Sequence, residues 1–555
     1  MQGPTYRCFL PDLTGFVDLH CIGPEPSGIH DNQIFSVGLL SWEFSPAIAD
    51  CRYRAPLAPR LARPKASSRW RVFASSLLAL CIIMFLVKKF LLLLILFASL
   101  TYCATEDSKK TFLQLYYSGK YQEAHSLLNK VNPQSKKAWE ERLHIHEEIS
   151  SCSFQSEETS RAAAMLRIGL FDQAKSGFRQ DWLSFLGRAK LAGWNNDPAL
   201  ARSYLNKAME LKPEDPDLLF YAGLYASDND QARDYFQKYL KSGAIDALKR
   251  NSAKQTINFI HKTKGLDLNQ ANLSSSIETI DSNFRDRRLT IRAKIDKDKE
   301  VVLLVDTGAA GLSLKDKSWK ARSAADLTLI GLGTKQRTRA ALMVFDQFSA
   351  GKFQMKNPVA AVSRNLQGYG IDGIVGAIIF SRYNIVLPMK NDSDVTLTTL
   401  DCDQLLKHLK QNGIHYKEKV TLPFYQVGKM MILKGRIKKS DQVMDILLDT
   451  GAQTSILSAA TAGKYVRINY PKTLKEKRRP LLIGIGGKID NLIHVENVDI
   501  EVGALRKSFN RMVALNLAQI SEALELEVDL ILGQDFLNGY TLVIDYKNNL
   551  VTFLS

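Results

Sequence analysis

Hydrophobic and polar positions change their spacing along the chain, and each change predicts a different kind of structure. Residues 107–264 carry apolar side chains at helical spacing, which predicts an α-helical region. From about residue 285 the apolar runs become short, alternate with polar residues and are separated by glycine turns, which is typical of an all-β region. The polar stretch 265–284 between the two regions is predicted to be a linker.

The first hundred residues follow neither pattern. Residues 1–83 are rich in proline and show no sustained periodicity, so we interpret them as disordered or as not belonging to the native protein, with Met84 as the start. Residues 84–104 then hold a short basic stretch and an apolar run, which predicts a signal peptide or a membrane anchor. The sequence therefore predicts an exported protein, held in the cell envelope or periplasm by a membrane anchor or as a lipoprotein.

The end of this apolar run carries a candidate modification site. The residues Leu-Thr-Tyr-Cys at 100–103 resemble a bacterial lipoprotein box, which makes Cys103 a lipidation candidate. Tyr102 departs from that pattern, because the position normally holds a small residue. Two alternatives therefore remain: cleavage of the signal peptide without lipidation, and an apolar segment that is not cleaved and acts as an anchor.

The helical region contains a recurring local pattern. Gly119–Ala124 and Gly169–Ala174 each place an aromatic residue two positions after a glycine and an alanine three positions further on. A third segment ends a helix at Pro213 and then starts another. These segments resemble tetratricopeptide repeats, and the resemblance implies a surface that binds a protein partner. A plain helical bundle without a binding role is the alternative.

Within the β region, one stretch of sequence occurs twice. Val301–Ala309 and Met444–Ala452 are both apolar runs that end in Asp-Thr-Gly-Ala. Asp306 and Asp449 are 143 residues apart (449 − 306), and matching glycine, tyrosine and lysine positions downstream are each 157 apart (533 − 376, 540 − 383, 547 − 390). The order of markers is the same in both copies. This indicates an internal duplication, with units at 285–397 and 420–555 and a linker at 398–419.

Each copy resembles a retropepsin-like aspartic protease lobe. The resemblance implies a multidomain fold in which the helical repeat module precedes two all-β acid-protease lobes. It assigns Asp306 and Asp449 as the catalytic pair. It also implies that Thr307, Gly308, Thr450 and Gly451 support the pair within the catalytic loops, and that Gly376 and Gly533 lie behind those loops. The candidate flaps contain Gly331, Gly333, Gly484, Gly486 and Gly487.

The chemistry of this family requires both aspartates. One carboxylate activates a water and one carboxylic acid polarises the peptide carbonyl, and two carboxyls about 3 Å apart cannot both ionise. Ala309 and Ala452 stand where some relatives carry serine, and loss of that hydroxyl predicts a less acidic pH optimum. Pro388 lacks an N–H donor, which predicts an edge or broken last strand in the first lobe.

Three interpretations of the two lobes stay open. In the first, the short tether pairs them within one chain as a pseudo-dimeric endopeptidase acting on protein or peptide substrates. In the second, second lobes pair between chains and the first lobe is structural. In the third, the chain is a catalytically silent adaptor with protease-like β lobes.

Composition narrows the classes of partner. The formal net charge is +17, but lysine and arginine are spread along the chain and do not form a stripe with aromatic residues, so a nucleic acid partner is not expected. Seven cysteines form no CxxC pair or cysteine–histidine cluster, so neither a metal site nor a cofactor is predicted.

Overall fold

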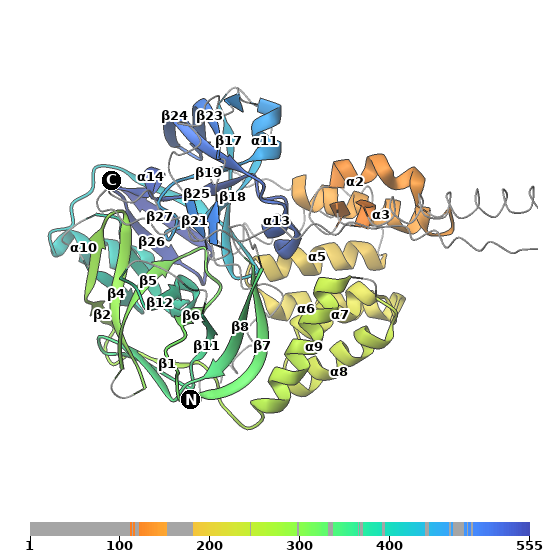
Figure 1. Ribbon diagram of the computed structural model, residues 1–555, viewed down its shortest axis with the longest axis horizontal. Helices are drawn as coiled ribbons and strands as arrows, with labels where there is room; N and C mark the ends of the chain where they lie inside the picture. The colour runs from red at the N-terminus through yellow and green to blue at the C-terminus, as the bar shows by residue number, and fades with distance from the viewer. Residues whose placement is uncertain are drawn as a thin grey trace, which may run out of the picture. The chain divides into compact units, whose positions relative to one another are not determined.

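The computed structural model describes most of the chain beyond residue 110 (Figure 1). It describes residues 111–151 and 181–555 except for 114, 117–120, 132, 245, 297–298, 331–336, 365, 367–369, 391–393, 439–442, 466–467, 470–481, 485–486 and 490–491. The predicted signal peptide or anchor, Cys103 and the repeat segment Gly169–Ala174 lie outside these residues. Among the described residues, no helix is both long and apolar enough to cross a membrane.

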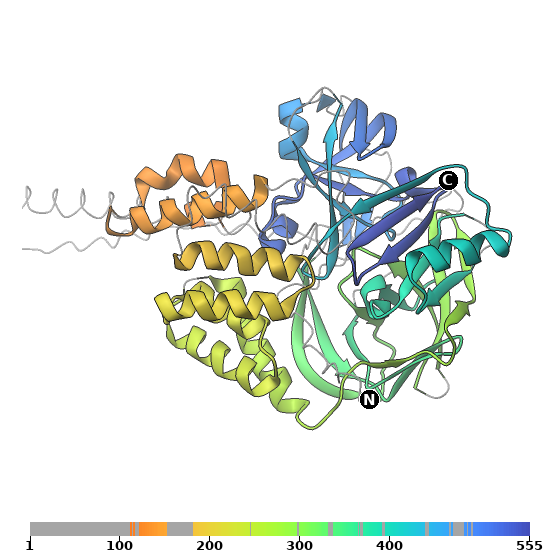
Figure 2. The same cartoon turned by 180° about the vertical axis from the view of Figure 1, so that it is seen from behind.

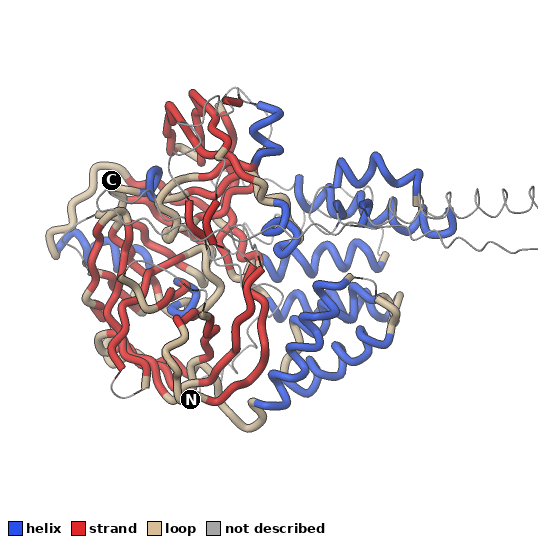
Figure 3. The backbone as a smooth tube through the Cα atoms, in the orientation of Figure 1, coloured by secondary structure: helices blue, strands red, loops and turns tan. Residues whose placement is uncertain are grey.

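The region predicted to be helical is built from helices (Figures 2 and 3). Their bounds are α2 Tyr121–Leu127, η1 Leu128–Lys130, α3 Pro133–Ser151, α5 Trp182–Trp194, α6 Pro198–Leu211, α7 Pro216–Leu224, α8 Asn229–Lys241 and α9 Ala247–Lys262. An aspartate precedes each of α5 to α9 and accepts a hydrogen bond from a backbone N–H of the first turn. Consecutive helices from α5 to α9 pack against one another. Their assignment as tetratricopeptide repeats stays a prediction.

The β region begins earlier than the sequence pattern indicates. The first lobe is one sheet in the order β1-β10-β9-β4-β5-β12-β6-β11-β8-β7, with β3 paired to β4. The bounds are β1 Gln270–Asn272, β3 Ser282–Arg285, β4 Arg288–Ile295, β5 Lys299–Asp306, β6 Leu312–Lys315, β7 Arg322–Ile330, β8 Arg337–Val344, β9 Gln347–Ala350, β10 Phe353–Lys356, β11 Val359–Ser363 and β12 Gly373–Gly376, followed by η2 Ala377–Phe380.

The second lobe repeats the central pairings of the first. Its sheet has the order β16-β17-β18-β25-β19-β24-β23-β20, and β18 pairs in parallel with β25 as β5 does with β12. The bounds are β16 Tyr425–Val427, β17 Met430–Ile437, β18 Met444–Leu448, β19 Ile456–Ser458, α11 Ala459–Tyr465, β20 Ile468–Asn469, β21 Leu482–Gly484, β22 Gly487–Ile489, β23 Ile493–Val502, β24 Leu505–Leu515, α13 Ala518–Leu524, β25 Leu530–Leu532 and α14 Gln534–Leu537.

A third sheet takes strands from both halves of the β region. Its order is β15-β27-β26-β13-β14-β2, with bounds β15 Lys419–Pro423, β27 Leu550–Leu554, β26 Thr541–Asp545, β13 Asn384–Pro388, β14 Val395–Thr398 and β2 Ile277–Ile280. Val386 pairs with Val543, which is its own equivalent at the 157-residue offset (543 − 386). The register is therefore self-reciprocal, as at a two-fold interface between identical subunits.

The structure corrects the prediction of two linkers. Within 265–284, β1 pairs with β10 and β2 pairs with β14, so this stretch belongs to the β region. Within 398–419 lies helix α10, Cys402–Gln411, which Asp401 caps and which buries Leu405, Leu406 and Leu409 against the shared sheet. The strands within 265–284 are short and pair with strands distant in sequence, so their local pattern did not reveal them. Helix α10 does carry a local pattern, with Asp401 at its N-cap and leucines at helical spacing.

The predicted effect of Pro388 is also wrong. β13 lies between β26 and β14 in the shared sheet and is neither an edge nor broken. Met389 donates to Tyr540 O and accepts from Gly539 N–H on the β26 side. Because successive residues of a strand face opposite neighbours, Pro388 points its nitrogen toward the β14 side, where pairing has already ended at Val386. The missing N–H therefore costs no ladder bond.

Candidate active site

The two Asp-Thr-Gly loops face each other, one from each lobe. Asp306 ends β5 and Asp449 directly follows β18, and both side chains are fully buried. A Cβ on Gly308 would lie 2.8 Å from Asp449 Cγ, and a Cβ on Gly451 would lie 2.5 Å from Asp306 Cγ. Each glycine thus lets the opposite carboxyl approach the backbone. The structure brings together the two aspartates that the sequence pattern singled out.

Two threonines connect these loops by reciprocal hydrogen bonds. The Thr307 N–H donates to Thr450 Oγ1 at 3.0 Å, and the Thr450 N–H donates to Thr307 Oγ1 at 3.0 Å. The Thr307 hydroxyl donates to Leu448 O at 2.7 Å, and the Thr450 hydroxyl donates to Val305 O at 2.9 Å. All four bonds are buried and cross between the lobes, so they fix the position of one loop relative to the other.

Backbone amides hold the carboxylates from beneath. Gly308 N–H donates to Asp306 Oδ1 at 2.7 Å, whereas Asp449 Oδ1 accepts from both Gly451 and Ala452, at 2.9 and 2.8 Å. Burial raises the pKa of Asp306 well above its usual value, and the neighbouring Asp449 raises it further. A buried acid with a raised pKa beside a second carboxyl is the electrostatic arrangement in which two acids share one proton.

The two loop-backing glycines occupy positions where a side chain does not fit. A Cβ on Gly376 would lie 2.2 Å from Ala309 O, and a Cβ on Gly533 would lie 2.7 Å from Thr454 O. Gly376 pairs in register with Asp306, and its N–H donates to Gly311 O. These glycines therefore allow a strand of each lobe to pass directly behind the Asp-Thr-Gly loop.

The second lobe has polar support that sequence reasoning missed. Asp535 accepts from the Thr454 hydroxyl at 2.9 Å and from the Ser455 N–H at 2.8 Å, and the Ser455 hydroxyl donates to it at 2.5 Å. The Gln534 amide donates to Thr450 O at 2.8 Å. One difference between the two copies could have indicated this support. The second copy has Gln-Asp directly after Gly533, whereas the first copy has Ala-Ile after Gly376.

The candidate flaps are described in part. β7 and β8 form the hairpin in the first lobe, but Gly331 and Gly333 lie in its tip at 331–336, outside the described residues. In the second lobe, β21 and β22 form a hairpin in which Gly484 pairs with Gly487, while Gly486 lies outside the described residues. Within the described parts of the chain, no three His, Cys, Asp or Glu side chains gather in a way that could hold a metal ion.

Comparison with known proteins finds one family model and solved structures that are similar to parts of the chain. A sequence model of the aspartyl protease family matches residues 291–378, a stretch that contains Asp306 and Gly376. Among solved structures, the chain is similar to an aspartic proteinase from Irpex lacteus, at 10% identity and a TM-score of 0.33, covering 50% of this chain and 97% of that one. No curated protein matches the chain.

Proposed function

We propose that this chain is an aspartic endopeptidase whose catalytic pair, Asp306 and Asp449, comes from one polypeptide. The observation that carries the proposal is the reciprocal packing of the two loops, in which each aspartate lies against the glycine of the opposite Asp-Thr-Gly. A site with two buried carboxyls, held by backbone amides and cross-bonded threonines, fits acid–base hydrolysis of a peptide bond.

The proposed reaction uses one proton shared by the pair. The ionised carboxylate takes a proton from a water, whose oxygen attacks the peptide carbonyl while the protonated carboxyl donates to the carbonyl oxygen. The resulting tetrahedral species collapses when the C–N bond breaks. The carboxyl that took the proton from water gives it to the amine nitrogen, and a hydroxyl of the tetrahedral species returns a proton to the other carboxylate. The raised pKa of Asp306, caused by burial and then by Asp449, supports a pair that keeps one proton at working pH.

We further propose that the pair forms within one chain. The self-reciprocal register between β13 and β26 supports this, because it gives the shared sheet the symmetry of a dimer interface without a second chain. Helix α10 connects the lobes beside that sheet, and such a short connection keeps their effective concentration around millimolar.

The location and the binding partner are proposals of the same kind. We propose that the chain is exported and tethered by residues 84–104, with Cys103 as the lipidation candidate, and that the helical module binds a protein partner. The support is the apolar run in that sequence and the repeat-like pattern.

Cleavage of a denatured protein by the purified full-length chain across pH 3–8 tests the activity. We expect cleavage that disappears in Asp306→Asn and in Asp449→Asn, with an optimum less acidic than pH 3.5 because neither loop carries the serine hydroxyl. Cleavage retained in either variant would contradict the proposal. Absence of cleavage at every pH, together with cellular function retained in the double variant, would favour the silent adaptor.

A further inference from the structure

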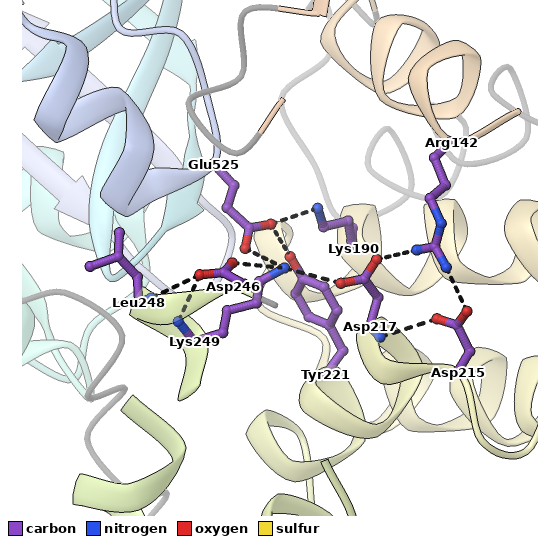
Figure 4. A network of polar contacts seen from close by, with 9 residues as sticks. All are labelled: Arg142, Lys190, Asp215, Asp217, Tyr221, Asp246, Leu248, Lys249 and Glu525. Carbon is purple, nitrogen blue, oxygen red and sulfur yellow. Dashed lines mark hydrogen bonds and ion pairs between the residues drawn. The ribbon is translucent and has the colours of Figure 1, made fainter. Parts of the chain in front are cut away.

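The helical region and the second lobe meet at a buried ionic cluster centred on Glu525 (Figure 4). Glu525 follows α13 in a left-handed conformation with φ 50°. Its carboxylate pairs with Lys249 Nζ at 2.7 Å and with Lys190 Nζ at 3.0 Å, and it accepts the Tyr221 hydroxyl at 2.5 Å. The lysine side chains are only 7% and 3% exposed. One acid of the second lobe thus holds two lysines and a tyrosine of the helical region.

A second layer of charges surrounds this cluster on the helical side. Asp217 contacts Lys249 at 3.3 Å and also pairs with Arg142, which in turn contacts Asp215 (Figure 4). Burial acts to raise the pKa of Glu525, but the ammonium groups of Lys249 and Lys190 outweigh it and hold this pKa below its usual range. Removal of one partner from such a cluster leaves uncompensated buried charge, which is strongly destabilising.

The helix that provides Lys249 also enters the core of the first lobe. Phe259 of α9 is fully buried in one hydrophobic cluster with residues of β7 and β8, and α9 packs along β7. Ala309 and Ala310, from the loop that carries Asp306, belong to the same cluster. Lys249 and Phe259 are ten residues apart (259 − 249), about 15 Å along a helix. One helix therefore joins Glu525 of the second lobe to the hairpin β7–β8 of the first.

We propose that α9 is a strut between the two lobes, and that Glu525 and Phe259 are positioning residues that set the resting position of the hairpin β7–β8 against Ala309 and Ala310. The catalytic consequence rests on the proposed peptidase function, whereas the mechanical coupling does not. With the Glu525 end released, α9 shifts on β7 and the hairpin loosens. The cross-bonded threonines keep the two aspartates together, so the main loss falls on substrate binding.

Hydrogen exchange of the full-length chain tests the coupling independently of activity. We expect Glu525→Gln to speed amide exchange in β7 and β8, which lie in the other lobe, as well as in α13 and α9. Glu214→Gln is the matched control, because Glu214 is an exposed acid of the helical region. Tyr221→Phe is the milder variant, which removes one hydroxyl that donates to Glu525 and leaves every charge in place. It should loosen the same segments less.

Kinetics on a peptide substrate give the second readout. For Glu525→Gln we expect a fall in kcat/KM on the order of tenfold, expressed mainly as a rise in KM, with the pH profile unchanged. Faster exchange confined to α13 and the helices, with β7 and β8 unchanged in both Glu525→Gln and Tyr221→Phe, would overturn the strut. If no variant or parent cleaves peptides, the peptidase proposal fails while the exchange result still decides the coupling.

Discussion

The two lobes share their Asp-Thr-Gly loops but support them differently. Both present Asp-Thr-Gly-Ala at the end of a buried strand, and both threonines make the same pair of cross-lobe bonds. Behind the loop, the second lobe uses the side chains of Thr454, Ser455 and Asp535. The first lobe has Gly311, Leu312 and Ile378 at the equivalent positions, whose side chains cannot make such hydrogen bonds. Both loops also pack in hydrophobic clusters, through Ala309 and Ala452. The same loop geometry is thus held with side-chain hydrogen bonds in the second lobe and without these bonds in the first.

A second pair of equivalent residues shows the same difference. Asp372 and Asp529 each accept a hydrogen bond from a backbone N–H of the strand that leads to Asp306 or Asp449. The donors are the N–H groups of Val302 and Asp445. Asp372 is partly exposed and pairs with Lys317, whereas Asp529 is buried and accepts the Thr461 hydroxyl. Burial raises the pKa of Asp529 to about 7. This carboxyl is therefore buried in the second lobe and partly exposed in the first.

The largest expected effect is on catalysis and is equal in the two lobes. Asp306→Asn and Asp449→Asn should each lower kcat/KM by about a thousandfold or more, because the pair acts as one unit. The measurement is peptide cleavage by the full-length variants, with folding checked by circular dichroism. A variant of the first lobe that keeps most of the activity would break the equivalence of the two lobes.

Next in size is the effect of adding a methyl group behind each loop. Gly376→Ala and Gly533→Ala should each destabilise by about 1–3 kcal/mol, since the new Cβ meets backbone atoms that cannot move aside freely. The first lobe should lose more, because the approach is 2.2 Å at Gly376 and 2.7 Å at Gly533. Urea denaturation measures both. The reverse order would show that the second loop, with its polar bonds, is the less adaptable one.

The threonine bonds should contribute equally from both sides. Thr307→Val and Thr450→Val each remove a buried hydroxyl and leave a buried N–H of the opposite loop without its acceptor, at a cost of about 1–3 kcal/mol. Each substitution removes one hydroxyl and therefore a different two of the four bonds, so the two single variants should lose similar amounts of stability. Urea denaturation of both variants measures this. A loss confined to one of them would argue against reciprocal bonding.

The smallest expected effect is on the pH dependence of stability, which should differ between the two lobes. Asp529 has a folded-state pKa raised to about 7, so between its ordinary value near 4 and pH 7 the folded chain binds more protons than the unfolded chain. Its contribution to stability therefore falls as pH rises, by about 1.4 kcal/mol per pH unit at most. Asp529→Asn should flatten this dependence relative to the parent chain, as measured by thermal unfolding at pH 4–7. Asp372→Asn is the matched variant in the first lobe, and an equal flattening there would remove the contrast.

The sequence revealed the parts of the site that repeat. The duplicated strand before Asp-Thr-Gly and the two loop-backing glycines are local patterns with a constant order, so the facing loops could be expected before the structure. Strands β1 and β2 could not, because they are short and their partners β10 and β14 lie far along the chain. The prediction of an edge or broken strand at Pro388 was wrong for a related reason. The effect of a proline in a strand depends on which neighbouring strand its nitrogen faces, and the sequence does not show this.

The ionic cluster was beyond sequence reasoning for another physical reason. Glu525 and Lys249 are 276 residues apart (525 − 249), and neither belongs to a recognisable motif. Charged residues on helices are ordinarily exposed, and only the packing of α5, α7 and α9 beside α13 buries these side chains.

The most direct test of the central account is a complementation experiment with two inactive chains. Asp306→Ala and Asp449→Ala chains carry different affinity tags and are produced together. One sample is purified through both tags in turn, a second is kept as a mixture, and both are assayed for peptide cleavage. Pairing of the two aspartates within one chain predicts that each variant and every mixture stay inactive. Activity retained by Asp306→Ala alone, or restored in the mixture, would show that aspartates pair between chains and would contradict the account.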